Sequence, residues 1–191
     1  AAAAGKTAAG KTAGAKTAAA APDSAEPATG SPTAGNAPGH KYIGVDKCGK
    51  CHKAEKKGDQ YGHWKKSKHS KAFQTLLSPK AKEAGKKVGV DDPSTDGKCL
   101  KCHVTAYDVE AKWLAEGFYP KQGVQCESCH GPGNDYAKKR IMEDKSAAMG
   151  KGLILPDEKV CVKCHNDESP FYKEFNFEKY FEQIKHPRPA K

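Results

Sequence analysis

The sequence predicts a mainly helical fold with long loops and little or no β-sheet. Only 37% of the 191 residues are hydrophobic, and the mean hydropathy is −0.81. A chain this polar buries only a thin core from its own side chains. No segment has the pattern of a convincing strand, whereas several segments carry apolar residues at helical spacing. The third observation is a five-residue motif that occurs four times.

Every cysteine of the chain lies in this motif, C-x-x-C-H, which attaches c-type haem. On one turn of helix, residues i, i+3 and i+4 share a face, so two thiols can bond the haem vinyl groups while the imidazole reaches the iron. The sequence therefore predicts a multihaem cytochrome c with four covalent haem c (heme c) groups, whose macrocycles supply the apolar mass that the side chains lack. The attachment residues are Cys48, Cys51, Cys99, Cys102, Cys126, Cys129, Cys161 and Cys164, and the proximal iron ligands are His52, His103, His130 and His165.

Two other interpretations of the cysteines are weaker. A pair of zinc ribbons would use four cysteines each, but a zinc ribbon does not need a histidine after every cysteine pair. A disulfide framework is also disfavoured, because a bond within a three-residue spacing closes a small loop and constrains little chain.

The chain divides at residue 39 by composition. Residues 1–39 contain no Val, Ile, Leu, Met or aromatic residue and are predicted to form a low-complexity tail, rich in Ala, Gly, Lys and Pro. Within this tail, Gly5 to Thr12 match the phosphate-binding pattern G-x-x-x-x-G-K-T, but no buried strand precedes them. We expect no nucleotide site and no nucleic-acid partner, and we predict that residues 40–191 form the tetrahaem domain.

Helix signals follow in chain order. Residues 59–77 are predicted to be helical, because His69, Ala72, Phe73 and Leu76 share one apolar face. The Ser78-Pro79 pair opens a short helix that Gly89 can close, and residues 91–98 form a turn-rich link. We expect the chain to break at Gly131–Gly133 and Asn134 to cap a helix that runs toward Ala148. Asp157 is expected to cap the turn that carries the fourth motif. The last helix is expected to begin near Asn176 and to end before Pro187.

Four histidines remain outside the motifs, one for each haem, so the count predicts two histidine ligands at every iron. His69 is the strongest distal candidate, since it lies on the apolar face where a haem would pack. His186 follows an aromatic-rich segment, and His40 opens the folded domain. His63 lies about 120° from His69 on a helix, so it is a candidate only for a different haem. Met142 and Met149 are the alternative ligands.

Five segments carry a resemblance to a known family, namely residues 47–54, 64–72, 123–133, 161–165 and 175–177. With these segments the chain resembles the tetrahaem cytochrome c family whose best-known member accepts electrons from hydroxylamine oxidoreductase. The resemblance covers residues 42–187 and implies closely stacked haem pairs, with His69 as a distal ligand and His186 in the place of a late distal histidine. Residues 134–140 lack a further histidine of that family, and His40 is the preferred substitute. The chain is also similar in haem count and size to tetrahaem extracellular cytochrome filaments.

The predicted function is electron transfer, without enzymatic activity. We expect a redox protein or an extracellular electron acceptor as partner, and a formal charge of +10 favours an acidic one. Homopolymerisation through a bond from His40 to the next subunit, giving a filament, is a further expectation. Two alternatives are a soluble periplasmic shuttle and a nitrogen-oxide reductase at a five-coordinate haem. Bacterial haem attachment occurs outside the cytoplasmic membrane, which predicts a periplasmic or extracellular location, and no apolar run is long enough for a membrane span.

Overall fold

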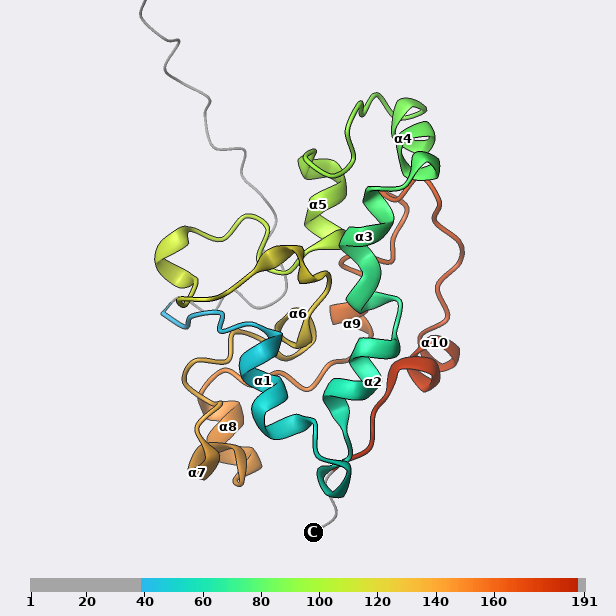
Figure 1. The fold of residues 1–191 in the computed structure, drawn as a ribbon. Coiled ribbons are helices and arrows are strands. Elements are labelled where there is room, and N and C mark those ends of the chain that lie inside the picture. Colours follow the sequence, from blue (N-terminus) through green and yellow to red (C-terminus); the bar gives the residue numbers. More distant parts are fainter. Residues whose placement is uncertain (1–38, 189–191) are drawn as a thin grey trace, which may run out of the picture. The chain divides into compact units, whose positions relative to one another are not determined.

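The computed structural model describes residues 39–188, so the predictions for the tail, including Gly5 to Thr12, lie outside the described residues. Within the described range the chain forms ten α-helices and four 3-10 turns, joined by long loops, and no strand (Figure 1). This confirms the predicted helical fold. None of the helices between residues 39 and 188 combines the length and the apolar character needed to cross a bilayer.

The α-helices are short, with four to eight residues each, and long loops join them. The α-helices are α1 (Val45–His52), α2 (Gln60–Lys66), α3 (Ala72–Leu76), α4 (Pro79–Lys86), α5 (Gly97–His103), α6 (Cys126–His130), α7 (Lys139–Met142), α8 (Lys145–Gly150), α9 (Glu158–Cys161) and α10 (Phe177–Ile184). The 3-10 turns are η1 (Glu55–Lys57), η2 (His69–Lys71), η3 (Ala111–Trp113) and η4 (Pro120–Gln122).

Three predicted helix starts are confirmed by their caps. The Ser78 hydroxyl accepts a hydrogen bond from the Ala81 amide, with Pro79 in the first helical position of α4. Asp157 caps α9 and Asn176 caps α10 in the same way.

Two predicted helices are wrong, because each is divided into shorter pieces. Residues 59–77 form α2, η2 and α3, with extended backbone at Ser67. The hydroxyl of Ser67 donates to the Trp64 carbonyl at 2.7 Å, and the Ser70 hydroxyl donates to the carbonyls of Lys65 and Ser67. These side chains occupy carbonyls that a continuous helix would use.

The second divided helix is the one expected after the Gly131–Gly133 break. Asn134 lies in a turn and caps no helix. Asp144 has extended backbone, and its carboxylate accepts from the Ala147 amide at 3.0 Å, so it ends α7 and starts α8. A capping residue inside the expected helix therefore overrides the pattern.

The apolar core is small, as the composition predicts. Phe73 and Leu76 of α3 pack with Val104, and the partly buried Cys99 and Leu100 of α5 complete the cluster. Both α3 residues come from the predicted apolar face, and α3 lies beside α5 (Figure 1). The aliphatic residues are therefore concentrated around the second C-x-x-C-H turn.

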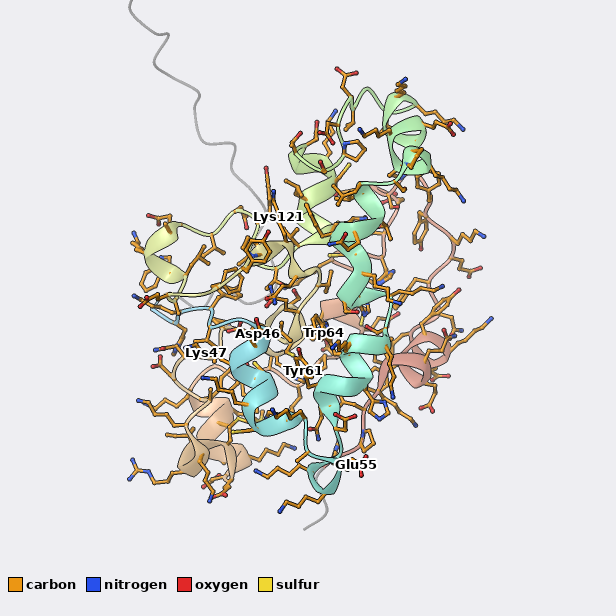
Figure 2. All side chains as sticks on the ribbon, viewed as in Figure 1. Asp46, Lys47, Glu55, Tyr61, Trp64 and Lys121 are labelled. Carbon is orange, nitrogen blue, oxygen red and sulfur yellow. The ribbon has the colours of Figure 1, made fainter. Side chains whose placement is uncertain are left out.

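The α1 and α2 helices pack closely around a glycine. Tyr61 lies against Gly49 of α1, where a Cβ atom would come within 2.8 Å of the tyrosine ring. Tyr61 and Trp64 lie on the side of α2 that faces α1 (Figure 2). The Trp64 indole N–H donates to the Val124 carbonyl at 2.7 Å, which connects α2 to the segment before α6. Three elements thus meet around the first and third motifs.

Candidate haem sites

Each C-x-x-C-H segment forms one helical turn, as predicted. The first three motifs lie at the ends of α1 and α5 and along the whole of α6. The fourth begins at the end of α9, and the amides of Cys164 and His165 both bond to the Cys161 carbonyl, at 3.2 and 3.0 Å. Both thiols and the imidazole of each motif are therefore available on one face.

Three of the four motif histidines have Nδ1 next to an oxygen that can only accept a hydrogen bond. Nδ1 must then carry the proton, which leaves the lone pair of Nε2 free to bind a metal. This donor set fits an iron ligated through Nε2. The pairs are His52 with the Gln60 Oε1 atom (3.1 Å), His103 with the Ala72 carbonyl (2.8 Å) and His130 with the Ile154 carbonyl (2.9 Å).

The fourth motif histidine is held by aromatic stacking. The His165 and Phe175 rings stack with centroids 4.8 Å apart and planes 17° apart, and Phe175 stacks in turn on Tyr180. The aromatic segment before and within α10 therefore orients this imidazole.

Cysteines of different motifs lie next to one another. A thiol of the first motif and one of the third lie close enough to shift the pKa of each other, and the same holds for the second and fourth motifs. These two neighbouring pairs are Cys48 with Cys126 and Cys102 with Cys164. Burial raises the pKa of Cys129 to about 12, and the nearby Cys161 contributes to that increase. Four attachment turns that are far apart in the sequence therefore form one continuous cluster.

Two histidines outside the motifs face motif histidines. The His69 ring centroid lies 6.0 Å from that of His165, and the His186 centroid lies 6.0 Å from that of His130. Imidazoles that bind one metal from opposite sides have ring centres roughly 6 Å apart, since each metal–nitrogen bond is about 2 Å long. Both separations therefore match two ligands of one iron.

These four imidazoles are also held in the neutral form that binds metals. Burial, which is partial at His165 and His186, lowers the pKa of His69, His130, His165 and His186. Neighbouring imidazoles lower the pKa further at three of them, and His165 is the exception. A neutral imidazole retains the lone pair that ligation requires.

His69 is positioned by a glycine of the segment before α6. The Val124 amide donates to the His69 carbonyl at 3.0 Å, and Gly123 beside it has φ +86° and ψ −153°, a conformation essentially restricted to glycine. A Cβ atom at Gly123 would lie 2.6 Å from the His69 oxygen and 2.9 Å from the Ser70 oxygen.

Replacing Gly123 with alanine should therefore destabilise the fold by about 1–3 kcal/mol or more, from strain alone. The backbone carbonyls that meet the new methyl group cannot move aside as a flexible side chain can. The denaturant midpoint of the haem-loaded protein measures the effect. The matched control is Gly150→Ala in α8, where a Cβ atom meets nothing within 4 Å, and an equal midpoint for both variants would contradict the prediction.

The other two distal candidates lie elsewhere. His40 donates through its Nδ1–H to the Asp135 carboxylate at 2.5 Å, and its ring faces Gly152. His63 is exposed on α2, near enough to His186 to lower the pKa of that residue. Asp135 was not expected from the sequence, because no spacing links it to His40.

A buried carboxylate inside the third motif was also not expected. Glu127 has no exposed surface, and its oxygens accept from the amides of Ile43 (2.8 Å), Gly44 (2.7 Å) and Gly133 (2.7 Å). Burial raises its pKa, while the three amides lower it. The middle positions of C-x-x-C-H carry no fixed chemistry, so the motif gives no signal for this role.

The alternative uses of the cysteines find no counterpart in the described range. All eight cysteines are free thiols, and no group of three or more His, Cys, Asp or Glu residues between 39 and 188 is arranged to hold a metal ion without a further cofactor.

A helical chain that gathers four C-x-x-C-H turns has the fold class of a multihaem cytochrome c. Residues 47–131 match the protein family described as cytochrome c554 and c-prime. The chain is 36% identical over 139 residues to cytochrome c-554 of Nitrosomonas europaea, across 65% of this chain and 57% of that protein. Its fold is similar to the reduced state of cytochrome c554 from the same organism, with a TM-score of 0.55 and 26% identity, across 78% of this chain and 85% of that one.

These matches confirm the resemblance to the cytochrome c554 family that the motifs predicted. The chain spans 57% of the length of the curated relative. The family match itself contains three of the four C-x-x-C-H motifs, and the fourth lies beyond it.

Proposed function

We propose that this chain is an electron carrier that holds four c-type haems and has no enzymatic activity. The observation that carries the proposal is the continuous cluster of four attachment turns. A haem iron bound at each turn supplies a one-electron couple. The chain contributes the covalent attachment, the orientation of each imidazole and the exclusion of water.

The cysteine contacts support a specific order of sites. The first motif neighbours the third, the third neighbours the fourth through Cys129 and Cys161, and the fourth neighbours the second. Electrons would then enter and leave at the first and second motifs, which are the ends of this series.

The facing imidazoles support two axial pairs. We assign His69 and His165 to one iron and His186 and His130 to another, on the basis of their 6.0 Å separations. With two imidazoles bound, neither iron has an open position for a substrate, which favours electron transfer over catalysis.

His40 and His63 remain candidate distal ligands. The carboxylate of Asp135 beside Nδ1 of His40 leaves Nε2 available for a metal, an arrangement common among histidine ligands. This contact supports a His40 that folds back on its own chain, and the filament with a bond between subunits stays a prediction of the sequence.

A cationic surface beside the first motif supports an acidic redox partner. Three lysines and one acidic residue, Glu116, line an open pocket of about 510 Å³ together with the exposed Cys51, so the lining is cationic on balance. The lysines are Lys47, Lys50 and Lys138. Positive charge next to a terminal site would steer an acidic protein to it. Covalent haem attachment supports a periplasmic location or one on the cell exterior.

The proposal predicts four haem additions in the intact mass of the purified protein. It also predicts electron paramagnetic resonance signals of low-spin ferric iron from at least the two haems with facing histidines. The reductive titration should take up four electrons per chain. An intact mass of the bare polypeptide, or of the polypeptide with zinc, would refute the proposal.

A nitrogen-oxide reductase is the alternative, and one observation favours keeping it. Among residues 39–188, the contacts between histidine rings involve His130 and His165 but neither His52 nor His103, so the first and second motifs are the places for an open iron position. Resonance spectra dominated by high-spin ferric iron would favour the reductase over the carrier.

A further inference from the structure

Gln60, the first residue of α2, connects two parts of the site that belong to different haems. Its side chain is buried, with 9% of its surface exposed. Its Oε1 atom lies 3.1 Å from Nδ1 of His52, and its Nε2 atom donates to the Pro187 carbonyl at 2.9 Å. Pro187 directly follows His186, so one amide contacts both a proximal ligand and the segment that carries a distal one.

The orientation of this amide is fixed by its neighbours. Nε2 also donates to the Lys57 carbonyl, so two backbone oxygens lie on the same side of the amide. Only the NH₂ group can face two carbonyl oxygens, so the amide oxygen must face His52. The amide oxygen only accepts, which places the proton of His52 on Nδ1 and the lone pair on Nε2.

A glycine provides the space for this contact. Gly58 has φ +95°, and a Cβ atom there would lie 2.7 Å from the Pro187 oxygen and 2.8 Å from Nε2 of Gln60. The turn before α2 is therefore shaped to let the Pro187 carbonyl approach the side chain of Gln60.

We infer that Gln60 is a positioning residue that sets the imidazole of His52 at the first haem and holds His186 in place at the third. The inference rests on the proposed function, since it assigns His52 and His186 to haem iron. The first and third sites are neighbours through Cys48 and Cys126, so this single amide acts on both members of an adjacent pair.

Only glutamine satisfies both contacts at this position. A glutamate would accept from His52 more strongly but would place negative charge against the Pro187 and Lys57 carbonyls. A methionine of similar length would neither accept from His52 nor donate to Pro187. The two substitutions therefore affect the first haem in opposite ways and the third haem in the same way.

The test compares Gln60→Glu and Gln60→Met in the full, haem-loaded chain. A stronger acceptor makes the His52 imidazole a better electron donor, so the reduction potential of the first haem should fall in Gln60→Glu and rise in Gln60→Met. Both variants should gain one carbon monoxide-binding haem per chain, because His186 is released from the third iron. Gln74→Glu and Gln74→Met, at an exposed position of α3, are the controls.

A purely structural role for Gln60 would give a different result. It would move the first potential in the same direction in both variants, or leave carbon monoxide capacity unchanged, and either outcome overturns the inference. If the variants do not fold, nuclear magnetic resonance of the unmutated protein decides. Slow exchange of the His52 ring N–H and of the Gln60 amide protons supports the inference, and fast exchange of either overturns it.

The haem count of the unmutated chain separates this inference from the proposed function. A chain without haem would refute both, whereas a chain with four haems and unchanged potentials in the variants would refute only the role of Gln60.

Discussion

Replacing His69 with alanine should open one haem iron and add one carbon monoxide-binding haem per chain. His69 faces His165 at the separation expected for two ligands of one metal, and its pKa is lowered by burial and by His165. An alanine cannot bind the iron, and the half-buried site keeps other side chains away. The measurement is a carbon monoxide titration of the reduced protein, with resonance spectra to show the change from low-spin to high-spin iron.

Free imidazole provides a second readout for this variant. If His69 is a ligand, added imidazole should bind the opened iron and restore the low-spin spectrum, which a general loss of packing would not allow. Lys68→Ala changes the exposed neighbour of His69 and is the control. Unchanged carbon monoxide capacity in His69→Ala would show that His69 only packs against its neighbours.

The attachment turns were predictable from the sequence because their chemistry is local. Two thiols and an imidazole at i, i+3 and i+4 require one helical turn, and the caps at Ser78, Asp157 and Asn176 depend on residues within three positions. Local hydrogen bonds also explain the two wrong helices. The hydroxyls of Ser67 and Ser70, and the carboxylate of Asp144, compete with the helical backbone, and apolar spacing does not record this competition.

The pairing of distant residues was not predictable from the residues alone. Spacing placed His69 on an apolar face, and that face does contain the buried Phe73 and Leu76. Spacing could not indicate which motif histidine His69 would face. His69 and His165 are far apart in the sequence, and only the tertiary fold brings them together. The contacts of Gln60 with Pro187 and of His40 with Asp135 have the same origin.

The small core explains why polar residues organise this fold. Besides the few buried apolar side chains between residues 39 and 188, four polar side chains are buried, and each of them is hydrogen-bonded. They are Gln60, Thr105, Gln125 and Glu127. The Thr105 hydroxyl accepts a hydrogen bond from the backbone N–H of Gln125 at 2.7 Å. The side-chain oxygen of Gln125 accepts one from the backbone N–H of Val45 at 2.8 Å. Buried polar groups stabilise a fold only when their partners are present, so each of these residues is sensitive to substitution.

Glu127 should be the most sensitive of them, and Glu127→Leu should destabilise the haem-loaded protein by several kcal/mol. Its carboxylate accepts three amide N–H groups, and a buried donor that loses its acceptor costs about 1–3 kcal/mol. Leucine has similar bulk but cannot accept. Two of the three amides, from Ile43 and Gly44, lead into α1, so the first motif should loosen from the third before the rest of the chain unfolds.

Equilibrium unfolding in guanidinium chloride measures this loss, and limited proteolysis near residues 41–44 tests its location. Glu127→Gln keeps one acceptor oxygen and should lie between the parent protein and Glu127→Leu. Glu83→Leu, on the exposed face of α4, makes the same chemical change where no buried amide depends on the carboxylate. Equal midpoints for Glu83→Leu and Glu127→Leu would mean that water replaces the carboxylate, and that Glu127 does not hold the first and third attachment turns together.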